Sequence, residues 1–138
     1  MNATKENHVE NRINTKRIAI AVFRERVTST LESAKHLLLV TVENGRIESR
    51  ELVQLREEDP LRKIDIVLEL KPDILICGGL TKMCEYKLRH SNIVLMPWIQ
   101  GNAENILSFC LKNTVIDGGY YSNRVFEDIL SHNFKHKY

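Results

Sequence analysis

The chain has 138 residues, of which 43% are hydrophobic and 28% charged, and its 20 basic residues nearly balance its 18 acidic ones to a net charge of +2. A chain of this length buries roughly two-thirds of its surface as one domain, so the fold needs no metal or disulfide. The scattered basic residues disfavour nucleic-acid binding, and the apolar runs are far shorter than the roughly 18 residues of a membrane span. Residues 1–16 lack the apolar core of a signal peptide, so we expect a cytoplasmic protein.

Three segments differ in composition. Residues 1–15 are polar and predict a disordered N-terminal tail. Residues 16–112 carry the periodic apolar pattern of one folded domain, and residues 113–138 form a C-terminal extension with spacing for one short helix.

The first half of the domain predicts three strands and no helix. Residues 17–22 and 37–42 are rich in β-branched and other apolar side chains, as in buried strands. Asn44-Gly45 is a strong signal for a two-residue hairpin, after which residues 47–54 run back as a third strand. The charges in this last strand suit a sheet edge that must resist pairing with another chain.

The second half alternates helices and strands. Asp59 is a plausible N-cap before Pro60, and Pro72 ends the helix that they open. Short apolar strands follow at 73–77 and 92–96. The helix between them is expected to turn an inner stripe toward the core, consisting of Leu80, Met83, Cys84 and Leu88.

After the last strand, Asn102 can cap a final helix that ends near residue 112. Strands linked by helices predict parallel pairing with both faces covered. We therefore expect an α/β protein, a three-layer α/β/α sandwich with the topology βββαβαβα.

The segment Cys77-Gly78-Gly79 is the most informative for function, because a buried strand passes through two glycines into a helix. Glycines allow the backbone to approach a ligand, and free amides at a helix start attract anions. The carboxyl end of a parallel strand is also where α/β folds place their sites. The alternative is that the two glycines only form a tight turn.

The cysteines and aromatic side chains near this turn are further candidates. Cys77 and Cys84 are candidate thiolate ligands, although an isolated buried cysteine is more often a packing residue. Cys110 is interpreted as packing. Two thiols are too few for a closed iron–sulfur site in one chain, which leaves an open or shared site. Trp98 would line a ligand cavity or plug the end of the sandwich.

Five short motifs, in order, resemble the dinitrogenase iron-molybdenum cofactor biosynthesis family. They lie at residues 17–22, 26–29, 37–47, 76–79 and 94–104 and span nearly the whole domain from residue 16 to residue 112. The resemblance implies a ribonuclease H-like fold with a five-stranded mixed sheet, strand order 3-2-1-4-5 and strand 2 antiparallel. It also implies binding, carrying or inserting iron–sulfur or iron–molybdenum precursors of the nitrogenase cofactor.

One position departs from the family. Many members carry a Ser-Pro-His-Phe stretch whose histidine is a proposed cluster ligand, and Ser29-Thr30-Leu31 stands there in this chain. Thr30 is a poor ligand for iron. His36, at the start of the second strand, is the nearest histidine and is retained as a candidate metal ligand.

These features predict a non-enzymatic carrier of an iron–sulfur or iron–molybdenum cluster that meets cluster donor and acceptor proteins, as a monomer or weak homodimer. The expected cofactor-binding residues are Cys77, Gly78, Gly79, Thr30 and Trp98, and the expected metal ligands are Cys77, Cys84 and His36. The alternative is a metal-free regulatory module that binds a small anion or a protein. A nuclease is disfavoured because residues 17–22 contain no carboxylate to hold Mg²⁺.

Overall fold

The structure is a computed structural model that describes residues 15–112 together with His132 and Phe134. The expected N-terminal tail, except for its last residue, and the helix expected in the C-terminal extension lie outside the described residues. The two described residues of the extension lie beyond α4, and the backbone carbonyl of Phe134 accepts a hydrogen bond of 2.7 Å from the amide of Gln100.

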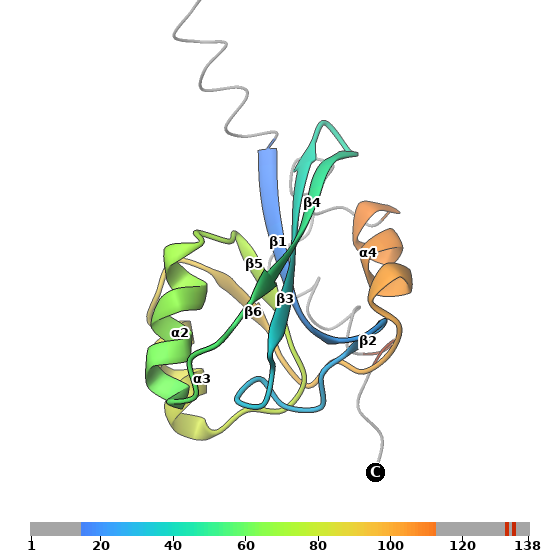
Figure 1. Cartoon of the computed structure of the whole chain (residues 1–138). Coiled ribbons are helices and arrows are strands. Elements are labelled where there is room, and N and C mark those ends of the chain that lie inside the picture. The colour runs from blue at the N-terminus through green and yellow to red at the C-terminus, as the bar shows by residue number, and fades with distance from the viewer. Residues whose placement is uncertain (1–14, 113–131, 133, 135–138) are drawn as a thin grey trace, which may run out of the picture.

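A mixed sheet stands between two helical layers, as Figure 1 shows. Its strands are β1 (Thr15–Phe23), β2 (Arg26–Val27), β3 (His36–Glu43), β4 (Arg46–Gln54), β5 (Ile74–Ile76) and β6 (Val94–Met96). The sheet runs β4-β3-β1-β5-β6, and β2 pairs with β1 alone. β1, β5 and β6 are parallel neighbours, while β3 is antiparallel to both β1 and β4.

The α/β class of the prediction is confirmed, but the count of five strands and the order 3-2-1-4-5 are not, because the short β2 adds a strand and renumbers all later ones. Arg24 adopts a left-handed φ of 57° and folds the chain back so that Phe23 pairs with Arg26. Arg24-Glu25 lacks the Asn-Gly or Asp-Gly signal of such turns, so the sequence pattern missed it.

Within residues 15–112, three helices begin at capping side chains, and two of these caps, Asp59 and Asn102, are predicted from the sequence. Asp59 accepts a hydrogen bond of 3.0 Å from the amide of Arg62 at the start of α2 (Pro60–Glu69). Thr81 caps α3 (Lys82–Arg89), and Asn102 accepts from the amide of Asn105 at the start of α4 (Ala103–Lys112). These side chains satisfy amides that a helix start leaves without partners.

Each sheet face packs against its own helical layer. On one face α4 covers a cluster that includes Ile18, Ile20 and Met96. On the other face α2 and α3 cover a second cluster that includes Leu75 and Cys77. Because successive strand residues point to opposite faces, β1 divides its side chains between the two cores. The predicted three layers are thereby present.

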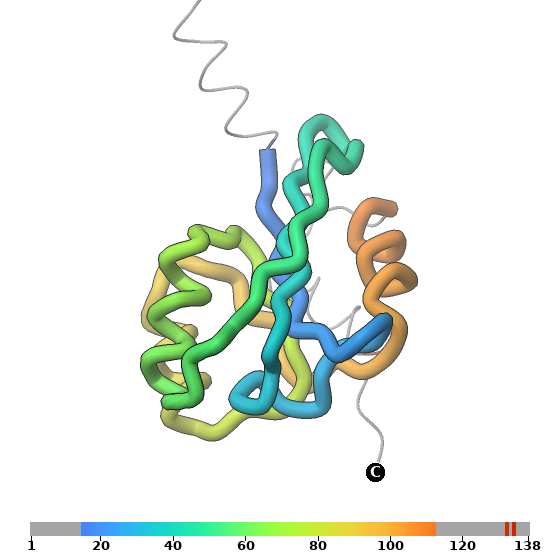
Figure 2. Tube along the Cα trace, in the orientation of Figure 1, coloured from blue at the N-terminus to red at the C-terminus, as the bar shows by residue number. Residues whose placement is uncertain are grey.

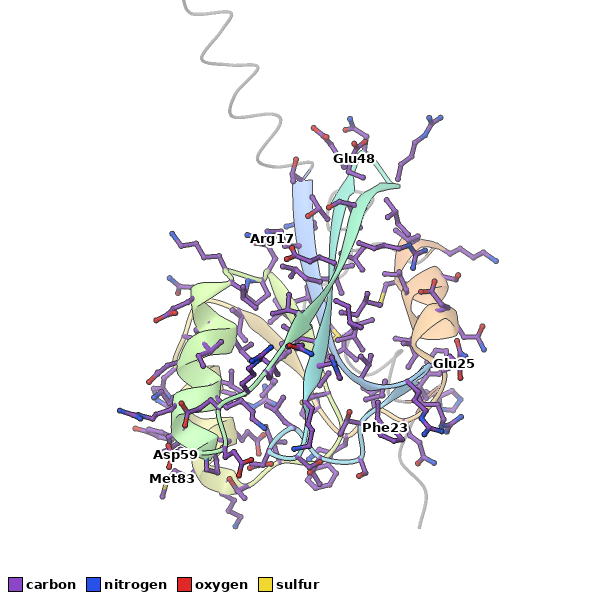
Figure 3. The ribbon with its side chains drawn as sticks, in the orientation of Figure 1. Arg17, Phe23, Glu25, Glu48, Asp59 and Met83 are labelled. Carbon is purple, nitrogen blue, oxygen red and sulfur yellow. The ribbon has the colours of Figure 1, made fainter. Side chains whose placement is uncertain are left out.

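One predicted core residue is wrong. Met83 was expected on the inner stripe of α3, but 64% of it is exposed, whereas Cys84 and Leu88 are buried. Figure 3 shows Met83 at the outer side of the helical layer. Residues one apart on a helix point about 100° apart, so a helix of eight residues buries only a narrow stripe. No helix in the described part of the chain is both long and apolar enough to cross a membrane.

Candidate functional site

Three loops meet at the carboxyl ends of the parallel strands. They are the segment 28–35 after β2, the turn from β5 into α3, and the turn after β6; Figure 2 shows the first two side by side at one end of the sheet. Backbone hydrogen bonds join them: the Gly79 amide donates to the Ser29 carbonyl, and the Leu31 amide donates to the Gly79 carbonyl, each at 2.8 Å. The loops form one connected rim above the sheet.

The β5–α3 turn has room for glycine alone at positions 78 and 79, because the backbone of the segment 28–35 and the ring of Trp98 lie very close to it. A Cβ atom on Gly78 would lie 2.4 Å from the carbonyl oxygen of Thr28 and 2.5 Å from that of Ser29. A Cβ on Gly79 would lie 2.7 Å from a ring carbon of Trp98. The close approach predicted for a ligand is thus made by the protein's own backbone and by a tryptophan ring.

Trp98 forms the wall opposite the segment 28–35. Its amide donates 2.9 Å to the Gly78 carbonyl, and its left-handed φ of 62° places the ring over Gly79. The side chain is 49% exposed, so one part of it packs on the turn while another faces solvent. It therefore does not plug the core, and it supplies an accessible aromatic surface.

Glu32, from the segment 28–35, places its carboxylate against the N-terminus of α3. Its carboxylate accepts a hydrogen bond of 2.8 Å from the Thr81 amide. Partial burial opposes its charge, but hydrogen bonds from Thr81 and from the Cys84 thiol outweigh burial and hold the pKa of Glu32 below its usual range. The helix start predicted to attract an anionic ligand already holds an internal anion.

An open pocket of about 380 Å³ lies between these groups and is called here the loop pocket. Its lining residues are Ser29, Thr30, Glu32, Gly79, Leu80, Thr81 and Trp98. Three of the predicted site residues, Thr30, Gly79 and Trp98, come together in it. The sequence analysis did not identify Glu32 as a site residue. An acidic residue in a loop is a weak signal, because only the fold shows that this loop lies against the start of α3.

The thiols lie beneath the pocket. Cys77 has no exposed surface and Cys84 is only 1% exposed, and both belong to the core cluster under α2 and α3. Burial is the main cause that raises the pKa of each thiol, and the nearby Glu32 carboxylate raises both further. Burial likewise raises the pKa of Cys110 to about 12. A buried neutral thiol is a packing group in this conformation.

His36 lies away from the loop pocket. It pairs with Val22 across the sheet and lines two other hollows, so the structure does not bring it to Cys77 and Cys84. Within residues 15–112, no three side chains of His, Cys, Asp or Glu gather in a way that could hold a metal ion. The described residues do not fit a closed cluster site.

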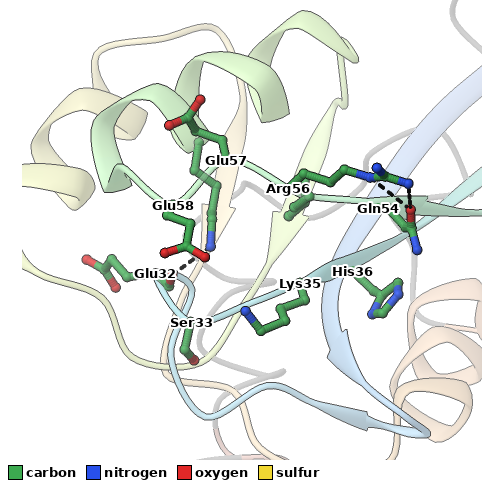
Figure 4. A pocket seen from close by; sticks show the side chains of 10 residues that line it. Glu32, Ser33, Lys35, His36, Gln54, Arg56, Glu57 and Glu58 are labelled. Carbon is green, nitrogen blue, oxygen red and sulfur yellow. Dashed lines mark hydrogen bonds between the residues drawn. The ribbon is translucent and has the colours of Figure 1, made fainter.

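A larger hollow of about 510 Å³ lies on the other side of Glu32 (Figure 4). The ammonium group of Lys63, which is only 4% exposed, donates to the backbone carbonyls of Glu32 at 2.7 Å and Ala34 at 2.8 Å. Arg56 donates to the side-chain oxygen of Gln54 at the far wall. Lys63 ties α2 to the loop that carries Glu32, and so supports the loop pocket.

Because the thiols are buried, we expect them to react slowly with thiol reagents. At pH 8 we expect the folded protein to react with Ellman's reagent more than tenfold more slowly than the urea-unfolded chain, because burial raises the pKa of Cys77 and Cys84. Stopped-flow absorbance measures both rates, and the unfolded chain is the internal control. One thiol that reacts in the folded protein at the unfolded rate, and that disappears in Cys77→Ala, would show that the β5–α3 turn opens readily.

Comparison with known proteins shows similarity in structure alone. No protein-family model matches the sequence, and no curated protein does. Among solved structures, PH0822 is 13% identical with a TM-score of 0.66, over 71% of this chain and 90% of that one. MJ0327 of Methanocaldococcus jannaschii, a "putative dinitrogenase", is 15% identical to this chain. Its crystal structure gives a TM-score of 0.58 and covers 71% of this chain and 89% of that one. Its NMR structure gives a TM-score of 0.53 and covers 66% of this chain and 80% of that one. At these identities the chain is shown to share the fold of these proteins.

Proposed function

We propose that this chain is a non-catalytic binding protein that takes its ligand in the loop pocket without a resident metal. One observation carries the proposal: the walls of the pocket are the Trp98 ring, hydroxyl groups and the Glu32 carboxylate, while the thiols are sealed below. The pocket therefore offers an aromatic surface and hydrogen-bond acceptors, which suit recognition.

The charge of the pocket selects the ligand. Glu32, with its lowered pKa, is ionised at neutral pH and repels anions. An ionised carboxylate beside a half-exposed indole ring fits a cationic group, because the carboxylate accepts its hydrogen bonds and the ring face attracts its charge. The best-fitting ligand is an ammonium or guanidinium group, such as a lysine or arginine side chain of a protein partner.

Trp98 makes the proposal directly testable, since it is the only tryptophan among the 138 residues. Titration with N-acetylargininamide is expected to change its fluorescence to saturation, whereas the neutral isostere N-acetylcitrullinamide and inorganic phosphate leave it unchanged. Glu32→Gln should weaken binding of the arginine compound about tenfold, as expected for loss of a charged hydrogen-bond partner.

The matched control is Glu69→Gln, which removes the same charge from an exposed position at the end of α2. It should bind like the parent protein. Equal binding of the citrulline compound, or an unchanged affinity in Glu32→Gln, would refute a cation-selective pocket.

A cluster carrier is the second candidate, on a ribonuclease H-like arrangement of the same elements. The observation in its favour is that Cys77 and Cys84 share one core cluster beneath the loop pocket, close enough that charge on Cys84 raises the pKa of Cys77. The fold similarity to a "putative dinitrogenase" agrees with this candidate. An iron–sulfur or iron–molybdenum cargo would have to open the β5–α3 turn to reach the thiolates.

Anaerobic reconstitution with iron and sulfide separates the two candidates. A carrier would gain charge-transfer absorption and bound iron that Cys77→Ala and Cys84→Ala lose and Cys110→Ala keeps. A metal-free module would show neither and would still give the arginine response. The cluster donor and acceptor partners, the absence of enzyme activity and the cytoplasmic location stay predictions.

A further inference from the structure

A third hollow, of about 380 Å³, lies on the other side of the segment 28–33 and is called here the hairpin hollow. It opens between the β1–β2 hairpin, that segment and the start of β3. Its lining residues are Val22, Phe23, Arg26, Val27, Thr28, Ser29, Ser33, Lys35 and His36. It is a different space from the loop pocket, with which it shares only Ser29.

The floor of the hairpin hollow is apolar. Val22 and Val27 are buried there, while Phe23 remains 63% exposed at its edge, where Figure 3 labels it. Large exposed aromatic side chains beside a concave apolar surface are typical of ligand sites. Phe23 also lies 5.2 Å below the guanidinium of Arg24, which adds positive charge near the rim.

One polar group in this lining has no partner. The Thr28 hydroxyl is buried, with 7% of the residue exposed, and it makes no hydrogen bond in the described structure. A buried hydroxyl without a partner costs free energy, and a ligand oxygen that accepts its proton removes that cost. Thr28 lines the hollow, but less than 1 Å² of its hydroxyl oxygen is accessible, so the wall must shift before a ligand can reach this donor.

The charged groups that line the hollow are all basic. Arg26 and Lys35 carry the positive charge, His36 adds a ring nitrogen, and no Asp or Glu is among the lining residues. The loop pocket differs in this respect because Glu32 lines it. Figure 4 shows Lys35 and His36 at the start of β3, where the hairpin hollow meets the larger one.

We propose that the hairpin hollow binds an organic anion with an apolar body, namely a medium-chain or aromatic carboxylate. The apolar body lies against Phe23 and Val27, and the carboxylate accepts hydrogen bonds from Arg26 and Lys35. Charge-assisted hydrogen bonds of this kind are about twice as strong as neutral ones. The site is independent of the loop pocket, so either can exist without the other.

Isothermal titration calorimetry of the full chain with octanoate tests this proposal. We expect saturable binding at one site per chain, with octan-1-ol and acetate each binding at least about tenfold more weakly, because one lacks the charge and the other the apolar body. The double variant Arg26→Gln/Lys35→Gln should lose at least about tenfold in octanoate affinity and keep its octan-1-ol affinity.

The matched control is Lys82→Gln/Lys112→Gln, which removes the same charge from exposed positions on α3 and α4. It should bind octanoate like the parent protein, and circular dichroism confirms that each variant is folded. Octanoate that fails to saturate, that binds no better than octan-1-ol, or that loses equal affinity in the control variant would overturn the proposal.

Discussion

Gly78→Ala is expected to destabilise the protein by about 3 kcal/mol, a large part of the stability of a domain of this size. The new methyl group would stand 2.4 Å and 2.5 Å from two backbone carbonyl oxygens, those of Thr28 and Ser29. Backbone held by hydrogen bonds cannot turn aside as a side chain can, so the segment 28–35 must separate from β5. Urea unfolding followed by circular dichroism measures the loss.

Gly79→Ala is the matched control. The three atoms nearest to its methyl group would all belong to the ring of Trp98, a half-exposed side chain and not backbone. We expect a loss of about 1 kcal/mol together with a red shift of tryptophan fluorescence as the ring enters solvent. Equal destabilisation by both substitutions would contradict the contact between Gly78 and the backbone of the segment 28–35.

Lys63→Met is expected to cost about 2 kcal/mol, because two loop carbonyls lose the ammonium donor that holds them. Met has a similar volume, so the loss reports on the hydrogen bonds more than on packing. The control is Lys35→Met, an exposed lysine in the same loop, which should change the free energy of unfolding by less than about 0.5 kcal/mol. A Lys63 variant as stable as the parent would show that the loop needs no such tie.

Lys63 also predicts a pH dependence. Burial, and then the positive charge of Lys35, lower the pKa of Lys63 below its ordinary value of 10.5. Between the lowered folded-state pKa and 10.5 the unfolded chain binds more protons than the folded protein, so the contribution of this residue to stability rises with pH in that window. Urea unfolding at a series of pH values should show this rise in the parent and lack it in Lys63→Met.

Local chemistry made the helix starts and the long hairpin predictable. Asp59 and Asn102 cap helices because their oxygens reach amides three residues ahead. Asn44 and Gly45 form the hairpin turn because both adopt left-handed φ, at 53° and 78°. Met83 shows the limit of such rules: its helical spacing from Leu80 and Leu88 predicts a place on the inner stripe, but only packing against α2 and the sheet decides which stripe is covered.

The site was predictable only in part. Gly79 and Trp98 each follow a parallel strand, and Thr30 belongs to the segment that leaves the first strand, so the sequence predicts that they lie near one another. The structure brings all three together in the loop pocket. The sequence could not show that Cys77 is sealed or that Glu32 takes the helix start. Both depend on the segment 28–35 crossing the β5–α3 turn, a contact between residues about 50 positions apart.

The sequence by itself determined where most strands and helices begin and end, because caps, hairpin turns and apolar periodicity act over a few neighbouring residues. Only the tertiary structure decided which groups face a ligand. Solvent exposure and the pKa of a buried group depend on which distant segments lie against it. Gly78 has no side chain because the backbone carbonyls of Thr28 and Ser29 occupy that space. The Glu32 carboxylate takes the place of the anionic ligand that the diglycine turn predicts.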